Sequence, residues 1–196
     1  MNYQVTSFYF YSIKNLLWVG FCLALSFFGS KAPFAFVLIT GVIFPVFISI
    51  RLHTLTEQGA VLSNNQAHEW LVYVNGIPVR ETRHHLANPF FYSKQRASQF
   101  FLRAFLVRAV LQIGIIGWML IQWPSYEMFI SYGGVVLALL VMLYSLTRTL
   151  CNLYNIYKDR WQVEQFTAPS ESEWFRAFVT WRNKRQGALE NLLAQF

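Results

Sequence analysis

Hydrophobic residues fall in four long runs, arranged as two pairs on either side of a polar interval. The first pair covers residues 15–30 and 33–50, and the second covers 104–123 and 128–146. Apolar runs of this length with so few charges are typical of helices that cross a bilayer, whose hydrocarbon core is about 30 Å thick. Short turns separate the two runs of each pair. The pattern therefore predicts an all-α polytopic membrane protein with four transmembrane helices in two hairpins.

The first hairpin leaves one alternative open. Residues 15–30 make about 24 Å of helix at 1.5 Å per residue, which is less than the hydrocarbon thickness. This run either spans with the help of the residues before it or forms a re-entrant hairpin with the second run, and both arrangements keep its two ends on one side. In the second run, Pro45 follows Gly41 by four positions and predicts a kink, because proline removes a backbone hydrogen bond.

The polar interval, residues 51–103, contains a β-hairpin signal near 69–82. Asn75-Gly76 lies between alternating apolar residues, and a two-residue type I′ turn favours this dipeptide because both of its positions need positive φ. Such a turn fixes which residues face one another. The predicted pairs are Val74 with Ile77, Tyr73 with Pro78, Val72 with Val79 and Trp70 with Glu81.

One face of this hairpin is predicted to bind a partner. It presents only apolar side chains, and two strands alone are marginally stable in water, so something must cover them. The cover is the protein's own cytoplasmic helices, the membrane surface or another subunit. The residues of this predicted partner-binding face are Trp70, Val72, Val74, Ile77 and Val79.

The C-terminal region, residues 148–196, is predicted to be helical. Apolar residues recur at helical spacing up to Trp161, which indicates that the fourth span continues into the cytoplasm. After Pro169, Ser170 stands three before Glu173 in a capping-box pattern. A final amphipathic helix is expected there, packed on a partner, on anionic lipid or on the protein's own cytoplasmic segments. Its predicted partner-binding residues are Trp174, Phe178 and Trp181.

Charge predicts the orientation. The chain has 16 Lys and Arg against 9 Asp and Glu, and nearly all the cations lie outside the two short turns. By the positive-inside rule, the polar interval and both termini are cytoplasmic, in a bacterial inner membrane, and the cations reflect a lipid bilayer rather than nucleic acid. Arg103 and Arg108 are predicted as cations at the cytoplasmic mouth of the third span, with Arg108 close enough to the edge to snorkel.

No catalytic constellation is recognisable. The histidines lack the spacing of a metal site, so neither a metal nor a cofactor is predicted. Cys22 and Cys151 are far apart, no nucleophile motif occurs, and no ionisable residue lies near the middle of a span. These features disfavour an enzyme and an ion-coupled carrier. The four histidines of the chain are His53, His68, His84 and His85.

Four segments follow from this reading. They are a first transmembrane hairpin at 1–50, a cytoplasmic insert at 51–103, a second transmembrane hairpin at 104–147 and a cytoplasmic extension at 148–196. The absence of recognisable chemistry and the apolar cytoplasmic surfaces predict a non-catalytic accessory, scaffold or docking subunit of a larger membrane complex. Its partners would be the lipid bilayer and other subunits or copies of itself. An oligomeric channel or transporter subunit is the alternative, and a membrane-bound metal-dependent or lipid-directed enzyme is less favoured.

Overall fold

The computed structural model describes seven stretches of the chain, and a few of their residues by backbone alone. The stretches are residues 13–62, 67–74, 77–84, 88–122, 129–167, 172–181 and 184–194. Backbone alone is described at 13–14, 67–74, 77–84, 129–131, 181 and 184.

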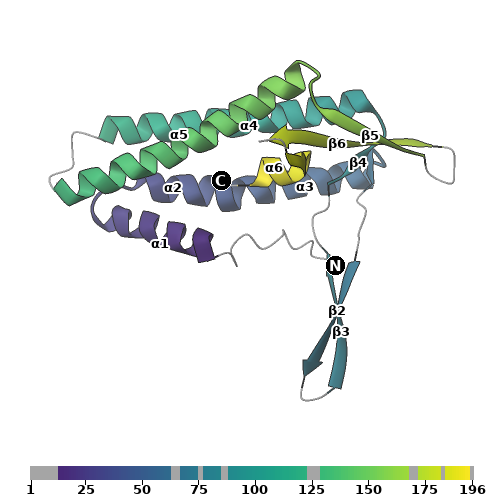
Figure 1. Cartoon of the computed structure of the whole chain (residues 1–196), viewed down its shortest axis with the longest axis horizontal. Helices are drawn as coiled ribbons and strands as arrows, with labels where there is room; N and C mark the ends of the chain where they lie inside the picture. Colours follow the sequence, from purple (N-terminus) through teal and green to yellow (C-terminus); the bar gives the residue numbers. More distant parts are fainter. Residues whose placement is uncertain are drawn as a thin grey trace.

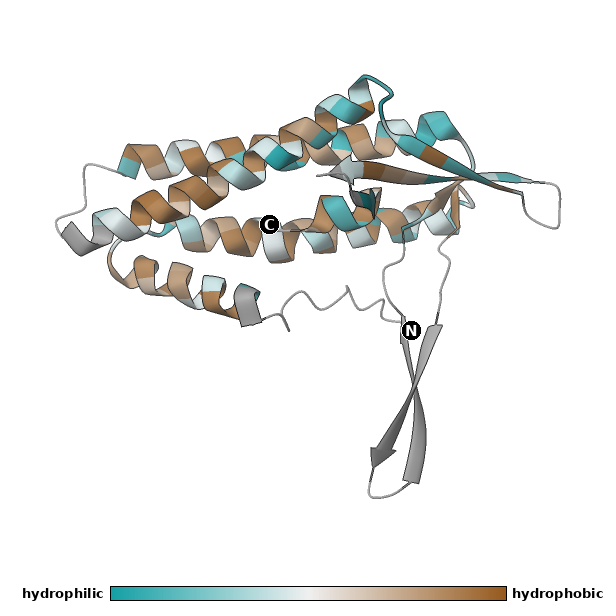
Figure 2. Cartoon of the chain, viewed as in Figure 1, coloured by the Kyte–Doolittle hydropathy of each residue, from teal (hydrophilic) through white to brown (hydrophobic). Residues whose placement is uncertain are grey.

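Helices make up most of the fold (Figure 1). Three continuous helical stretches are long and apolar enough to cross a membrane, Ala32–Glu57, Lys94–Gln122 and Tyr132–Tyr157, and they indicate a membrane protein. Figure 2 shows hydrophobic residues along most of their length. The helices are α1 (Ile13–Phe27), α2 (Ala32–Leu38), the π-helix η2 (Ile39–Ile43), α3 (Phe44–Glu57), α4 (Lys94–Gln122), α5 (Phe129–Tyr157) and α6 (Ala188–Leu193).

Helix α1 is shorter than each of these three helical stretches. Its 15 residues give about 22 Å of helix, less than the hydrocarbon core. It packs against α5 at Gly134, where an added Cβ would lie 2.6 Å from Cδ2 of Leu25. A fourth span and the two-hairpin arrangement therefore stay predictions.

The second apolar run is one helical stretch with a π turn in its middle. The turn spans Ile39–Ile43, and Pro45 lies in the first turn of α3 that follows. Proline has no N–H to donate to the carbonyl four residues earlier, which belongs to Gly41, and a locally widened turn is one way in which a helix accommodates this loss. Thr40 Oγ1 donates to the Phe36 carbonyl at 2.6 Å in the same region.

The strands form two separate antiparallel sheets. The predicted hairpin is β2 (Ala67–Val74) paired with β3 (Ile77–His84), and its register is the predicted one, with Val74 opposite Ile77 and Tyr73 opposite Pro78. The second sheet has the order β1-β4-β6-β5, with β7 also paired to β6. Its strands are β1 (Val61–Leu62), β4 (Phe90–Phe91), β5 (Gln162–Thr167), β6 (Glu173–Trp181) and β7 (Lys184–Gly187).

The C-terminal region corrects the sequence prediction. Helix α5 ends at Tyr157 and does not continue through Trp161, because Asp159 adopts positive φ (55°) and turns the chain into β5. The predicted amphipathic helix is also wrong, since Trp174, Phe178 and Trp181 all lie in strand β6. Among the described residues that follow Asp159, the helical ones are 188–193.

Strand β6 forms because its side chains alternate between buried and less buried positions at residues 177–180. Ala177 and Val179 are buried in the core, while Phe178 between them is only partly buried. Strand β5 pairs along one edge of β6, and β4 and β7 pair along the other, so the backbone hydrogen bonds that a helix would have made internally are made between strands.

Two hydrophobic clusters hold the fold together. The first lies where the five-stranded sheet meets α3, α4, α5 and α6, and contains Phe101, Phe105 and Leu189. The second lies between α1, α2, α4 and α5 and contains Phe36 and Met119. Burying each such large side chain stabilises the fold by roughly 1.5–3 kcal/mol. Figure 1 shows the sheet at the end of the bundle where α3 ends and α4 begins.

Candidate functional site

Arg108 on α4 binds the C-terminal end of α6. Its side chain is buried, with 3% of its surface exposed, so it does not snorkel as the sequence predicts. Its guanidinium donates to the main-chain oxygens of Leu192, of Ala194 at 2.5 Å and of Asn191 at 3.4 Å. The last carbonyls of a helix lack intrahelical donors and carry partial negative charge, so a cation there both satisfies and stabilises them.

A second buried arginine holds the side chains of the same segment. Arg148 on α5 donates from Nε and Nη2 to Oδ1 of Asn191 at 3.1 and 2.6 Å, and from Nη2 to Oε1 of Gln186 at 3.3 Å. We call Arg108, Arg148, Gln186 and Asn191 the anchor cluster. All of the acceptors in these bonds are neutral oxygens. The cluster attaches the C-terminal segment to α4 and α5.

Asn88 makes a third polar link at this end of the molecule. It lies in the segment before β4 and is buried. Its Nδ2 donates to the Ala177 carbonyl of β6, and its Oδ1 accepts from the Leu189 N–H of α6 at 3.3 Å. An added Cβ at Gly187 would lie 3.3 Å from this side chain, so the glycine permits the close approach. Sequence analysis missed Asn88, Arg148 and Asn191, because their partners are far away in the chain.

The face of the five-stranded sheet that points away from the core carries aromatic and arginine side chains. The Arg176 guanidinium lies 5.3 Å from the ring centre of Phe90 and 5.4 Å from that of Phe178, and the Arg185 guanidinium lies 3.9 Å from the ring centre of Phe178. Phe90 also contacts the exposed ring of Phe166 at 5.8 Å between centroids. We call this surface the outer face, consisting of Phe90, Glu164, Phe166, Trp174, Arg176, Phe178 and Arg185.

The structure places some of the predicted partner-binding residues on the outer face and describes others by their backbone alone. Trp174 and Phe178 both lie on the outer face, brought there by a strand instead of a helix. Trp181 is in the same strand, opposite Lys184, with only its backbone described. The hairpin residues are paired as predicted, but their side chains lie outside the described part of the structure. These residues are Trp70, Val72, Val74, Ile77 and Val79.

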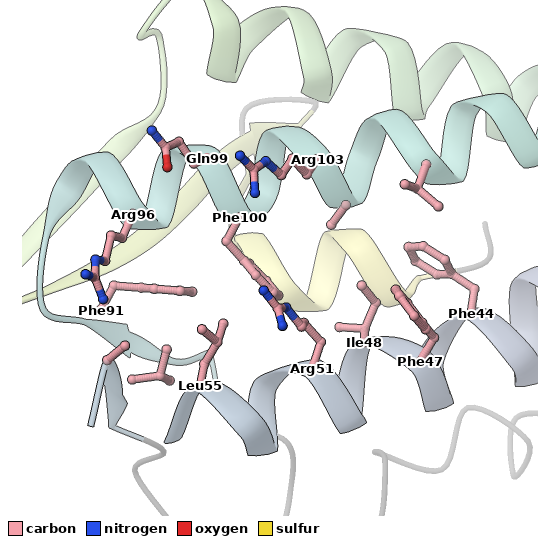
Figure 3. A pocket seen from close by; sticks show the side chains of 14 residues that line it. Phe44, Phe47, Ile48, Arg51, Leu55, Phe91, Arg96, Gln99, Phe100 and Arg103 are labelled. Carbon is pink, nitrogen blue, oxygen red and sulfur yellow. The ribbon is translucent and has the colours of Figure 1, made fainter. Parts of the chain in front are cut away.

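A cleft lies between α3 and α4 near the sheet. Its volume is about 400 Å³, and most of its lining is apolar. Arg51 from α3 and Arg96 and Arg103 from α4 line it with exposed side chains, and none of the three has a hydrogen-bond or ion-pair partner among the described residues (Figure 3). We call it the arginine cleft. Arg103 is thus an accessible cation, whereas Arg108, five residues further along α4, is enclosed.

No metal site is found among the described residues, which contain no group of three His, Cys, Asp or Glu suited to hold an ion. His53 lies 3.5 Å from Glu57 on the same exposed helix surface. His68 and His84 belong to β2 and β3, where side chains are not described, and His85 falls outside the described ranges.

An exposed carboxylate joins the end of α5 to the start of α4. Asp159 accepts from Lys94 Nζ at 2.9 Å and from Trp161 Nε1 at 2.7 Å. These hydrogen bonds, first of all the one from Lys94, hold the pKa of Asp159 below its usual value. The contact is a surface interaction, and it helps to set the turn that leads into β5.

The described part of the chain presents the outer face and the arginine cleft, and no group of catalytic residues is assembled within it. Comparison of the chain with protein-family models, with curated proteins and with solved structures finds no significant match.

Proposed function

We propose that this protein is a non-catalytic docking subunit of a larger membrane assembly, and that the outer face of its five-stranded sheet binds another protein subunit. The apolar helices would hold it in the bilayer, and the cation distribution would place the sheet on the cytoplasmic side of a bacterial inner membrane. The observation that carries the proposal is the clustering of Phe90, Phe166, Phe178, Arg176 and Arg185 on one accessible sheet face.

The chemistry of this face suits a protein partner. Aromatic residues and arginine are enriched at the centres of protein interfaces, where a few of them supply most of the binding energy. The stacked guanidinium groups and the ion pair between Arg185 and Glu164, at 2.5 Å, order these side chains before any partner arrives. Ordering in advance lowers the entropy cost of binding. The matching partner surface is apolar at its centre and acidic at its rim.

Strand β5 adds a second feature that favours a polypeptide. Within the described part of the chain it pairs only with β6, and no described strand pairs with the backbone groups of its other edge. Another polypeptide strand can satisfy such groups by extending the sheet, which a lipid surface cannot do. Residues 162 and 164–167 of β5 are exposed. The edge and the outer face are adjacent through Glu164 and Phe166.

The test is isolation of the tagged full-length protein from its native membranes in mild detergent, with the stoichiometry of co-purifying subunits measured by mass. Phe178→Asp places a charge in the middle of the outer face, and loss of an interface centre of this kind weakens binding by about thirtyfold or more. The wild type should retain a stoichiometric partner that Phe178→Asp loses.

Tyr157→Asp is the matched control, since Tyr157 is an exposed aromatic residue at the end of α5, outside the outer face. A melting curve of each variant separates lost binding from lost folding, and Arg176→Glu is a second variant of the same face. Recovery of the protein alone from the wild type, or equal partner retention by all variants, would overturn the proposal.

A further inference from the structure

Two arginines of the arginine cleft, Arg51 and Arg103, lie at equal distances from the far ends of their helical stretches. Arg51 lies nineteen positions after Ala32 at the start of α2, and Gln122 at the end of α4 lies nineteen positions after Arg103. Each interval corresponds to about 29 Å of helix, which is the thickness of the hydrocarbon core. If the far ends of both helices lie at one membrane surface, Arg51 and Arg103 lie together at the level of the lipid headgroups at the other.

The lining of the arginine cleft is apolar toward the middle of the helices and carries arginines toward the sheet. Phe44 and Phe47 line it on the side of Arg51 that faces the middle of the apolar stretches (Figure 3). Val107, four residues beyond Arg103 on α4, also belongs to its lining. Phe47 and Val107 are exposed on the helix surface, at 59% and 40% of their areas. An apolar groove therefore begins at the two arginines and continues toward the hydrocarbon region. Arg96 lies seven residues before Arg103, roughly 10 Å further from that region.

All charged side chains that line the arginine cleft are positive. Its lining includes three arginines and no aspartate or glutamate. No described residue forms an ion pair or hydrogen bond with these arginines, whereas Arg108 and Arg148 both donate hydrogen bonds to oxygens of the C-terminal segment. Guanidinium groups bind phosphate through paired, charge-assisted hydrogen bonds, and basic pockets between membrane helices bind anionic lipid headgroups.

We propose that the arginine cleft is a binding site for one anionic phospholipid of the surrounding membrane. The phosphate lies between Arg51 and Arg103, one acyl chain follows the groove past Phe47 and Val107, and Arg96 contacts the outer part of the headgroup. This site is separate from the outer face of the sheet, and its existence does not depend on a protein partner.

The test is native mass spectrometry of the delipidated full-length protein in detergent, titrated with phosphatidylglycerol or with phosphatidylcholine of the same acyl chains. Wild type should bind one phosphatidylglycerol in preference to phosphatidylcholine. Each arginine near a lipid phosphate contributes about fivefold in affinity, so Arg51→Gln/Arg103→Gln should weaken phosphatidylglycerol binding about 25-fold. Lys158→Gln/Arg160→Gln, which removes the same charge from exposed positions outside the cleft, should leave binding unchanged.

Val107→Trp provides a second, independent variant. It keeps every charge, sits on an exposed helix position and fills the groove, so it should also abolish selective binding. Inorganic phosphate in millimolar excess should not displace the lipid, because the acyl chain contributes to affinity. Equal binding of the two lipids by wild type, undiminished binding by the Arg51→Gln/Arg103→Gln variant, or displacement by inorganic phosphate would each overturn the proposal.

Discussion

The anchor cluster and the arginine cleft both contain arginines on apolar helices near the sheet, but the surroundings of these arginines differ. In the anchor cluster, the guanidinium groups of Arg108 and Arg148 are buried and donate to oxygens of the same chain. In the arginine cleft, Arg51, Arg96 and Arg103 are exposed and have no partner among the described residues.

This difference shows why an arginine in a membrane helix cannot be interpreted from its depth alone. Arg103 and Arg108 are five residues apart on α4 and therefore point in different directions around it. One direction meets α6, whose terminal carbonyls replace water as acceptors. The other meets an open groove between α3 and α4. Arg108 is therefore a structural anchor, and Arg103 is available to a ligand.

The largest expected effect is on stability, from Arg108→Ala. This change leaves three buried carbonyl oxygens without their donor and opens a space beneath α6, and each buried acceptor left without a hydrogen bond costs roughly 1–3 kcal/mol. Denaturant unfolding in detergent measures the loss. The matched control is Arg103→Ala on the same helix, with an expected change within about 0.5 kcal/mol. Similar losses from both variants would contradict the comparison.

Asn191→Ala should have a smaller effect in the same cluster. It removes the Oδ1 that accepts both Nε and Nη2 of Arg148, and leaving a buried cation with fewer acceptors costs roughly 1–3 kcal/mol. Limited proteolysis should then release the C-terminal segment faster than in wild type. Cleavage at the wild-type rate, with unchanged unfolding, would show that Arg148 does not depend on this contact.

The paired variant Arg51→Gln/Arg103→Gln should hardly change the stability of the lipid-free protein. Both side chains are exposed and form no hydrogen bond or ion pair with other described residues, so the expected change is within about 0.5 kcal/mol. Denaturant unfolding of the delipidated protein checks it. A loss as large as that from Arg108→Ala would mean that the cleft arginines also hold the fold together.

A small effect that depends on pH is expected at Asp159, whose carboxylate is exposed. Its pKa is lowered in the folded state, chiefly by Lys94, so its contribution to stability is present above the ordinary carboxyl pKa and is lost as pH falls through the lowered value. Asp159→Asn should reduce stability slightly at neutral pH. In unfolding curves taken from pH 6 down to pH 3, the difference from wild type should shrink below about pH 4. A difference that is constant across this range would contradict the prediction.

Local patterns in the sequence predict part of this fold. The apolar runs locate the membrane-compatible helices, and Asn75-Gly76 predicts the register of β2 and β3 because the turn geometry acts over adjacent residues. The hydrophobic spacing of Trp174, Phe178 and Trp181 fits a helix, whereas the strand follows from the alternation of Phe175, Ala177 and Val179. Two periodicities coexist there, and the pairing of β6 with β4, β5 and β7 decides between them.

The candidate sites depend on contacts that local patterns do not contain. Arg108 is recognisable in the sequence as an unusual residue, but its acceptors lie more than eighty positions away. The arginine cleft joins Arg51 to Arg103 across the whole polar interval. A cation on each helix near the same predicted membrane surface was the available signal, and the packing of the two helices brings these cations to one cleft.

The most direct test of the distinction between the two regions is the melting temperature of the protein with and without added phosphatidylglycerol. A ligand at 100 times its Kd stabilises the folded state by about 2.7 kcal/mol, which corresponds to roughly 5–10 °C for a chain of this size. Wild type should gain this shift, Arg51→Gln/Arg103→Gln should lose most of it from an unchanged lipid-free melting temperature, and Arg108→Ala should melt lower in both conditions. An equal lipid-dependent shift in wild type and in Arg51→Gln/Arg103→Gln would contradict the account.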